Sequence, residues 1–380
     1  MAGAPRRKRL SAAEALDLLE RADLMDLGRR ADAVCRRLHP GRVRTYAVDR
    51  NINFTNICAC RCRFCAFWRP ADAPDAYILD EGAIAGKIAE AVALGATHIL
   101  MQGGVHGGLG IEFYEALLRG IRRRFAVRIH SFSPPEIVAL AAREGLSVRE
   151  TLERLRSAGL DSLPGGGAEI LVDRVRRLIS PRKCTADEWI ACMRTAQTLG
   201  MPTTATMVFG HVETAEERVE HLRRLRELQD ETGGFTAFIA WPFQAPNTDL
   251  ERSGALGPGW QPVTGAEYLR MVAVARLFLD NVANVQASWV TMGPKIGQTA
   301  LEFGANDLGS TMIEENVVAA AGCVHRASPR RSGATPPGTA GVPWPDGWRS
   351  RATPAGLERL IRSAGFEPRR RDCYYRMAGD

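Results

Sequence analysis

The chain lacks any apolar run near the ~20 residues that a membrane-spanning helix needs, and its first ten residues are basic rather than apolar. Neither a membrane span nor a secretory signal is therefore predicted, and we expect a cytoplasmic protein. There is also no Gly-x-Gly-x-x-Gly turn after the first predicted strand and no repeat of solenoid period. These two absences argue against a dinucleotide-binding sheet and against a repeat protein.

The excess of basic residues is not organised like a nucleic-acid-binding surface. The 50 Lys and Arg outnumber the 43 Asp and Glu, for a net charge of +7. The excess gathers near both ends of the chain, at residues 6–9 and in the arginines at 326, 330, 331, 349, 351 and 369–371. Because aromatic residues are not interleaved with these basic ones, solvated tails are favoured over a stacking platform for nucleic acid. No nucleic-acid partner is predicted.

Short β-branched or apolar runs alternate with longer helical patterns, which is typical of a parallel sheet built from βα units. We expect eight strands, at residues 43–53, 97–102, 127–132, 161–163, 202–208, 236–241, 284–289 and 306–310. We expect helices at residues 12–37, 80–94, 111–124, 147–158, 186–199, 215–231, 265–281 and 294–303. Eight strands with intervening helices predict a (β/α)8 TIM-type barrel. An open doubly wound sheet is the alternative, with the fourth and eighth strands the weakest of the eight.

Four segments are predicted along the chain. Residues 1–42 form a helical N-terminal segment, and residues 43–325 form the barrel. Residues 326–353 are rich in Pro, Gly and Arg, which predicts an exposed loop, and residues 354–380 form a last helix and a basic tail.

Three of the nine cysteines, Cys58, Cys62 and Cys65, stand in a Cys-x3-Cys-x2-Cys spacing directly after the first strand. A structural zinc site needs four ligands, and no second Cys-x2-Cys pair is present. The odd number of cysteines disfavours a disulfide framework. Three thiolates fill three corners of a 4Fe–4S cluster and leave the fourth iron open for another ligand. We interpret Cys60, inside the same loop, as a bystander.

The cysteine loop, with an aromatic residue before the last cysteine, resembles the signature of the radical S-adenosylmethionine (SAM) superfamily. Further matching runs are Gln102-Gly-Gly, His130 to Glu136, the core Pro-Gly-Gly-Gly-Ala-Glu-Ile-Leu of residues 164–171, residues 203–231, 233–243 and 286–295, and residues 304–318. Within the superfamily these runs resemble the cyclic dehypoxanthinyl futalosine synthases of menaquinone biosynthesis.

The resemblance implies two cofactors, a 4Fe–4S cluster and SAM, and a reaction. Reductive cleavage of SAM gives a 5′-deoxyadenosyl radical, which removes the 4′ hydrogen of the ribose of dehypoxanthine futalosine. The new carbon radical adds to the aryl ring of the same molecule, and loss of an electron and a proton restores aromaticity. A reduced flavodoxin or ferredoxin would supply the electron.

The resemblance, together with the residues at the strand ends, predicts which residues form the active site. The cluster ligands are Cys58, Cys62 and Cys65. Residues expected at SAM are Phe64, Gln102, Gly103, Gly104, Glu169 and Phe209. For the proton acceptor, His211, Asp307 and His130 remain alternatives, and Ser131, Trp289 and Lys295 are expected at the substrate. A satisfied polar role for His211, a surface position for Lys295 and a plain turn at Gly103-Gly104 are the structural alternatives. Thr214 and Glu217 have the spacing of a capping box.

Two other functions compete with this one. A sister radical SAM enzyme, aminofutalosine synthase or one half of the deazaflavin (FO) synthase, would share the first step and differ in the acceptor. A non-catalytic iron–sulfur protein, acting as a redox sensor or on nucleic acid, would explain the basic ends but not the polar and aromatic strand ends. Neither the electron donor nor the oligomeric state is predicted.

Overall fold

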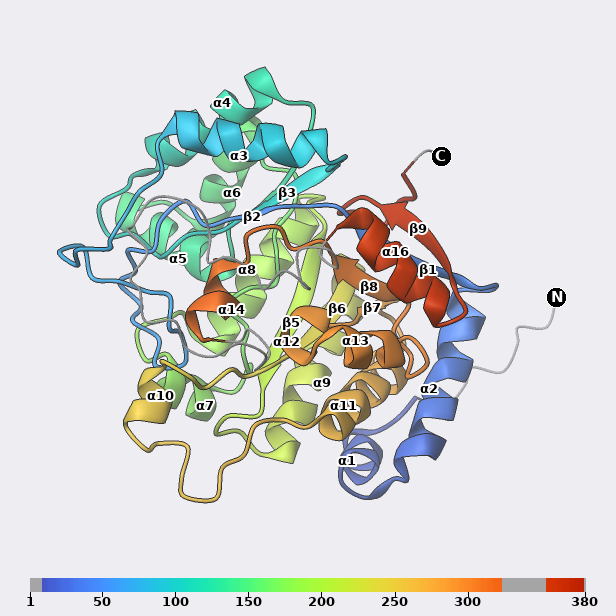
Figure 1. The fold of residues 1–380 in the computed structure, drawn as a ribbon. Helices are drawn as coiled ribbons and strands as arrows, with labels where there is room; N and C mark the ends of the chain where they lie inside the picture. The colour runs from blue at the N-terminus through green and yellow to red at the C-terminus, as the bar shows by residue number, and fades with distance from the viewer. Residues whose placement is uncertain (1–8, 323–352, 379–380) are drawn as a thin grey trace.

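A computed structural model describes residues 9–322 and 353–378 (Figure 1). Its strands are β1 (Val43–Ala47), β2 (Asn51–Ile52), β3 (His98–Met101), β4 (Arg128–Ser131), β5 (Thr203–Phe209), β6 (Phe235–Pro242), β7 (Asn284–Gln286), β8 (Asp307–Ser310) and β9 (Glu367–Arg371).

The helices before β5 are α1 (Ala12–Arg21), α2 (Leu24–Leu38), α3 (Glu81–Ala93), α4 (Ile111–Arg124), α5 (Pro134–Glu144), α6 (Val148–Ala158), α7 (Asp173–Ile179) and α8 (Ala186–Thr198). Those after it are α9 (Ala215–Thr232), α10 (Asp249–Arg252), α11 (Gly265–Phe278), α12 (Trp289–Met292), α13 (Pro294–Ala300), α14 (Asn316–Ala320) and α16 (Pro354–Ser363). The predicted capping box of α9 is confirmed, because Glu217 N–H bonds the Thr214 hydroxyl and Thr214 N–H bonds the Glu217 carboxylate.

The strands form a ring. One sheet has the order β5-β6-β7-β8-β1-β9 and the other the order β2-β3-β4, all pairs parallel. Because β1 runs on into β2, the sheets share their first strand. Isolated bridges from His130 to Ser162 and from Leu163 to Thr203 close the gap between β4 and β5. The predicted TIM-type barrel is confirmed. At the predicted fourth strand, residues 161–163, the structure has only these isolated bridges.

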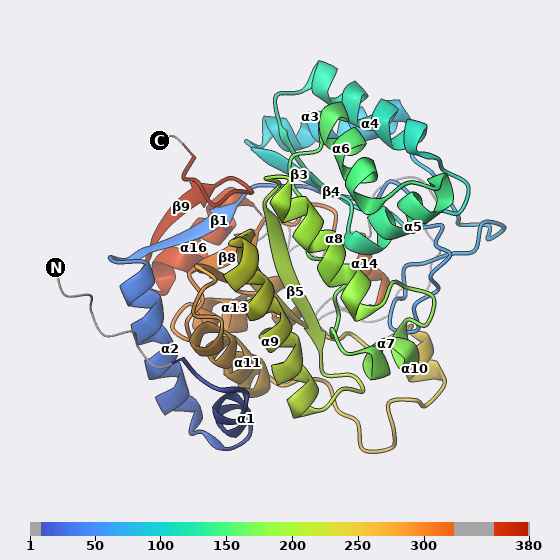
Figure 2. The same cartoon turned by 180° about the vertical axis from the view of Figure 1, so that it is seen from behind.

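Two buried apolar clusters support the ring. The larger includes Trp189, Tyr268 and Phe278 and packs α8, α9 and α11 against β5 to β8. The smaller packs α3 to α6 on β3 and β4 around Phe54 and Phe132. The helical cover therefore lies outside the strands, as Figures 1 and 2 show, and the carboxyl ends of the strands remain available for a site.

The N-terminal helical segment is two helices rather than one. Asp23 ends the continuity, because its carboxylate accepts from Asp26 N–H (2.9 Å) and caps α2. α2 packs on α11 and α1 packs on α9, so both lie against the outer helices (Figure 2). The pair therefore extends the helical layer and contributes no strand.

The C-terminal segment contains a ninth strand, which the prediction of a basic tail missed. β9 pairs in parallel with β1, on the edge opposite β8, in register from Val43–Glu367 to Ala47–Arg371. The prediction that the terminal arginines are all solvated is wrong for Arg371, which is 4% exposed. Its guanidinium donates to Asp307 at 2.5 and 2.8 Å. A buried ion pair therefore ties this strand into the barrel.

At the other end, Arg9 forms ion pairs with Asp230 and Asp280. Most of the predicted loop of residues 326–353, and Cys323, lie outside the described residues. No helix of the described residues is long and apolar enough to cross a membrane.

The buried ion pair predicts a large loss of stability when Arg371 is changed. Arg371→Met would leave Asp307 as a buried charge without its cation, which costs about 3–5 kcal/mol of the free energy of unfolding. The measurement is urea denaturation followed by circular dichroism. Arg369→Met is the matched control, because Arg369 pairs with Glu367 on the surface, where such pairs contribute about 0–1 kcal/mol. Equal losses for the two variants would contradict the assigned role of the pair.

Candidate active site

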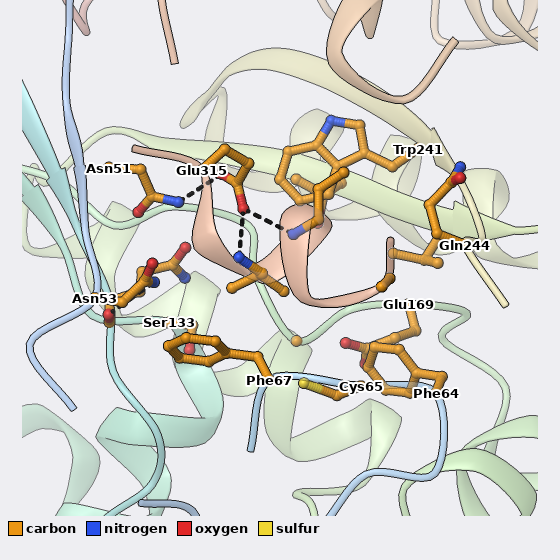
Figure 3. A pocket seen from close by; sticks show the side chains of 18 of the residues that line it. Asn51, Asn53, Phe64, Cys65, Phe67, Ser133, Glu169, Trp241, Gln244 and Glu315 are labelled. Carbon is orange, nitrogen blue, oxygen red and sulfur yellow. Dashed lines mark hydrogen bonds between the residues drawn. The ribbon is translucent and has the colours of Figure 1, made fainter. Parts of the chain in front are cut away.

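A cavity of about 270 Å³ opens at the carboxyl ends of the strands (Figure 3). Its walls come from the segments after β2, β3 and β4, from β5 and β6, and from the segments after β7 and β8. Trp241 and Glu315 lie on one side, and Phe64 and Cys65 lie on the opposite side. Most of the lining surface is apolar, with a few polar groups, which is typical of a small-molecule site.

The cysteine loop forms one wall of this cavity. Cys58, Cys60, Cys62 and Cys65 all line it. The loop is held from two sides: Ala59 N–H donates to the Val105 carbonyl (2.8 Å), and Arg63 N–H donates to the Ile179 carbonyl (2.7 Å). Val105 N–H in turn donates to the Cys58 sulfur (3.3 Å). The loop is therefore placed by main-chain contacts with the segments after β3 and α7.

The cysteine sulfurs are not arranged for a single metal ion. Among the described residues, no group of three His, Cys, Asp or Glu side chains converges on one ion position. A tetrahedral zinc site would need such convergence, with Zn–S distances of about 2.3 Å. A cubane cluster places each thiolate on a different iron, so its sulfurs lie farther apart. Three cysteines on one cavity wall could each bind a different iron of a cluster.

Cys60 belongs to the same wall and interacts with Cys58. A hydrogen bond from the Cys60 thiol lowers the pKa of Cys58 to about 6, and the same contact together with burial raises the pKa of Cys60. Burial raises the pKa of Cys62 to about 12. The bystander role of Cys60 stays a prediction, because Cys60 lines the cavity together with the three cysteines of the motif.

A buried cation lies beside the cysteines. The Lys183 ammonium is 3.1 Å from the Glu169 carboxylate and 5.0 Å from the centre of the Phe64 ring. Burial opposes its charge, but the neighbouring Cys62 and Glu169 raise the pKa of Lys183 above its ordinary value. This cation offsets negative charge on the cysteine wall. Sequence reasoning missed it because Lys183 follows α7, away from any strand end.

Glu169, which was predicted to contact SAM, lines the cavity, and its contact with a cofactor stays a prediction. It lines the cavity with φ of 39°, a left-handed conformation that is uncommon for a residue with a side chain. Its Oε1 meets Lys183, whereas its buried Oε2 has no hydrogen-bond partner among the described residues and lies 3.5 Å from Arg176. A carboxylate oxygen at a cavity wall that accepts no hydrogen bond from the protein is available to accept one from a hydroxyl group of a bound ligand.

The Gln102-Gly103-Gly104 segment lines the same cavity, and close packing explains Gly104. A Cβ at Gly104 would lie 2.2 Å from the Ile57 carbonyl oxygen and 2.8 Å from the Cβ of Cys58. Any side chain there would push the cysteine loop away. Gly103 N–H donates to the Glu136 carboxylate (3.0 Å), whose pKa burial raises to about 7. The glycines are thus more than a plain turn.

A polar corner lies across the cavity from the cysteines. Asn51 donates to Glu315 (2.6 Å), and Glu315 also accepts from the amides of Val317 and Val318 (Figure 3). The side-chain oxygens of Asn51 and Asn53 are buried and lack partners among the described residues. The prediction did not include these residues. Their signal is the i, i+2 spacing of two asparagines at the end of one strand, which places both on one face.

The other predicted residues divide between two cavities and the core. Trp289 lines the main cavity, and its indole N–H donates to the Ser310 carbonyl (3.0 Å). His130 lines a second cavity of about 80 Å³ deeper in the barrel, with Nδ1 2.7 Å from the Ser162 hydroxyl. The two cavities share lining residues such as Gln102, Thr206 and Gln286, so they lie next to each other.

The structure places the remaining five predicted residues away from both cavities. His211 is buried with Nδ1 2.9 Å from Glu213, which is the satisfied polar role. Asp307 is bound by Arg371 and by the Thr45 hydroxyl. Ser131 donates to the Met101 carbonyl, and Lys295 is exposed on α13. The Phe209 ring is buried against the Arg218 guanidinium. A residue at a strand end can point outward or into the core, and sequence position alone does not decide which.

Comparisons with known proteins agree with this geometry. A family model described as the radical SAM superfamily matches residues 52–225, and one described as the CofH/MqnC C-terminal region matches residues 232–332. The chain is 47% identical over 322 residues to the cyclic dehypoxanthine futalosine synthase of Halalkalibacterium halodurans, covering 84% of this chain and 85% of that protein. The protein of the same name from Streptomyces coelicolor is 45% identical, with coverage of 84% and 79%.

A relative with another name is nearly as similar. The 5-amino-6-(D-ribitylamino)uracil–L-tyrosine 4-hydroxyphenyl transferase of Methanothermobacter thermautotrophicus is 42% identical, covering 94% of this chain and 91% of its own. Among solved structures, methylornithine synthase (PylB) matches with a TM-score of 0.69 at 16% identity, covering 95% of each chain. That structural match concerns the fold alone.

These matches confirm the predicted family and confirm an enzyme rather than a non-catalytic protein. The family models together span most of the barrel, and they include the cysteine loop and the cavity walls. The chain is an enzyme of the radical SAM superfamily, in the group that carries the CofH/MqnC C-terminal region.

Proposed function

We propose that this enzyme cyclises dehypoxanthine futalosine to cyclic dehypoxanthine futalosine, a reaction of menaquinone biosynthesis. The observation that carries the proposal is a mostly apolar, aromatic-lined cavity whose wall is the Cys58–Cys65 loop. The two relatives that bear the synthase name, at 47% and 45% identity, support this reaction over others of the superfamily.

Membership of the superfamily implies SAM and an iron–sulfur cluster. Cys58, Cys62 and Cys65 would hold a 4Fe–4S cluster, with one iron left for SAM. With an electron from a reduced flavodoxin or ferredoxin, the bound cofactors would supply the 5′-deoxyadenosyl radical that removes the ribose 4′ hydrogen. Lys183 would balance charge beside the cysteines, and Gln102, Gly103, Gly104, Glu169 and Phe64 would contact SAM.

The chain's contribution to ring closure is mainly positional. The 4′ carbon joins the carboxyphenyl ring of the same molecule, so the cavity must hold the two ends of the substrate within reach of each other. Trp241 and Trp289 contribute rigid apolar wall and exclude water and other quenchers. The ring radical formed by closure then loses one proton and one electron, and that electron would return to the cluster oxidised in the first step. Of the three predicted proton acceptors, His130 alone lines a cavity of the described residues, but that cavity is the deeper one, and burial lowers the pKa of His130 to about 3, which makes it a weak base.

A second reaction has specific support. The relatives named as tyrosine hydroxyphenyl transferases are 39–42% identical, and the first of them covers more of this chain than the synthases do. In that reaction the aryl group comes from a second molecule, tyrosine, and the acceptor is 5-amino-6-(D-ribitylamino)uracil, as the name states. The same cysteine loop would serve both reactions.

An anaerobic assay separates the two reactions. Protein with its cluster reconstituted is incubated with SAM and a reductant, in one reaction with dehypoxanthine futalosine and in another with tyrosine plus the ribitylaminouracil. Mass spectrometry is expected to show a cyclic product two mass units lighter than dehypoxanthine futalosine, since one hydrogen goes to the adenosyl group and one is lost as a proton and an electron. Product from the second pair alone would overturn the proposed cyclisation.

Substitution of the cysteines tests the ligand assignment. Cys62→Ala should remove the iron–sulfur absorbance and formation of 5′-deoxyadenosine together, because two protein sulfurs would remain for the cluster. Cys60→Ala is the matched control, since it removes a buried thiol from the same loop and wall. It is expected to keep iron content and absorbance close to the parent protein. A cluster lost from the Cys60 variant and kept in the Cys62 variant would refute the assignment.

A further inference from the structure

A second, smaller chamber adjoins the main cavity in the interior of the barrel. This lower chamber is the cavity of about 80 Å³ noted above, large enough for two or three water-sized groups of ~30 Å³ each. TIM barrels usually fill this region with layers of packed branched side chains. Here most of the lining surface is apolar, but Asp49, His98, His130, Thr204 and Gln286 bring polar groups to it. Polar groups at an unfilled chamber fit a ligand that can form hydrogen bonds with them.

Asp49 is the polar group in the chamber with an open bonding position. It is 6% exposed, and its Oδ2 lies 3.5 Å from His98 Nε2. Its buried Oδ1 accepts no hydrogen bond within normal distance among the described residues, and the Ser310 side chain, which also lines the chamber, interacts with the same carboxylate. Burial opposes ionisation, but the hydrogen bond from His98 holds the pKa of Asp49 below its ordinary value. A buried carboxylate with a free oxygen calls for a hydrogen-bond donor.

The other groups at the chamber favour a neutral donor over an ion. Arg371 is the cation there, and both oxygens of Asp307 bind its guanidinium. The hydroxyls of Thr204 and Thr206 are engaged by the amide and the carbonyl of Gly165. Because the cation is already paired, an anionic group would find no counterion, whereas hydroxyl groups can donate to Asp49.

The C-terminal segment lines one side of the chamber. Arg371, Cys373 and Tyr375 belong to this lining, and each comes from β9 or the four residues after it. Tyr374 reaches Asp161 (3.4 Å). Asp49 itself is buried, and a hydrogen bond to a buried carboxylate discriminates strongly between ligands.

We propose that Asp49 accepts hydrogen bonds from the hydroxyl groups of the substrate's five-carbon sugar chain, so that the lower chamber is a hydroxyl subsite. The identity of the substrate rests on the proposed function. Both candidate reactions supply a ligand of this chemistry, a ribose in dehypoxanthine futalosine and a ribityl chain in the alternative acceptor. The aryl group then occupies the aromatic-lined cavity above.

Deoxy analogues of the substrate test the subsite. Binding of the substrate that the parent enzyme turns over, and of its 2-deoxy and 3-deoxy sugar analogues, is measured anaerobically by calorimetry. In the parent enzyme, at least one analogue should bind about 10–100-fold more weakly than the substrate, because a hydrogen bond to a buried carboxylate is lost. Asp49→Asn should bind the substrate itself about 10-fold or more weakly and should largely lose this discrimination.

Glu213→Gln is the matched control. It neutralises another buried carboxylate that faces a histidine, and it lies outside both cavities. It is expected to lower the melting temperature but to keep the ratio between substrate and analogues. An unchanged ratio in folded Asp49→Asn would overturn the subsite. If Asp49→Asn does not fold, the parent enzyme alone decides. Equal affinities for the substrate and both deoxy analogues overturn the subsite, and a weaker affinity for an analogue supports it. Turnover of neither candidate substrate would instead count against the proposed function.

Discussion

The contact between the cysteine loop and the segment after β3 positions everything else at the site. Ala59 and Val105 are joined by a main-chain hydrogen bond, and the Val105 amide reaches the Cys58 sulfur. This approach is possible because Gly104 has no side chain; a Cβ there would lie 2.2 Å from the Ile57 carbonyl oxygen. The cysteines therefore form a wall of the cavity at the strand ends instead of projecting into solvent. Chemistry started at a bound cluster would reach a substrate held by the barrel.

The opposite end of the barrel depends on the Arg371–Asp307 pair. The pair holds β9 against β1, so the residues that follow β9 lie beneath the barrel interior. One end of the barrel is thus a cavity opening onto the cysteines, and the residues after β9 line the lower chamber. This segment places the buried Arg371–Asp307 pair beside the polar groups of that chamber. A buried ion pair is a costly way to hold a strand, because both charges must be desolvated.

Alternation of strand and helix patterns was sufficient to predict the barrel, because each βα unit carries its own local signal. The cysteine spacing likewise predicted which residues form a cavity wall. Side-chain direction was not predictable: His211 and Asp307 end or follow strands as expected, yet both are engaged by buried partners, Glu213 and Arg371. β9 was missed because its sequence, Glu-Pro-Arg-Arg-Arg, has a solvent-exposed composition. It pairs with β1, more than 300 residues away in the chain, and a local sequence pattern cannot predict pairing between such distant segments.

The two candidate reactions differ in where the aryl group comes from, and the cavity geometry bears on that difference. Cyclisation brings an aryl group tethered to the sugar, so one continuous molecule must extend from the lower chamber into the aromatic-lined cavity. Transfer from tyrosine needs, in addition, an acceptor for the amino acid's ammonium, whereas both aryl groups bring a carboxylate. Lys183, a buried cation on the cysteine wall, is already paired with Glu169. The carboxylate therefore does not separate the two reactions. The tether between sugar and aryl ring does, because it fixes the distance between the sugar in the lower chamber and the ring in the cavity above.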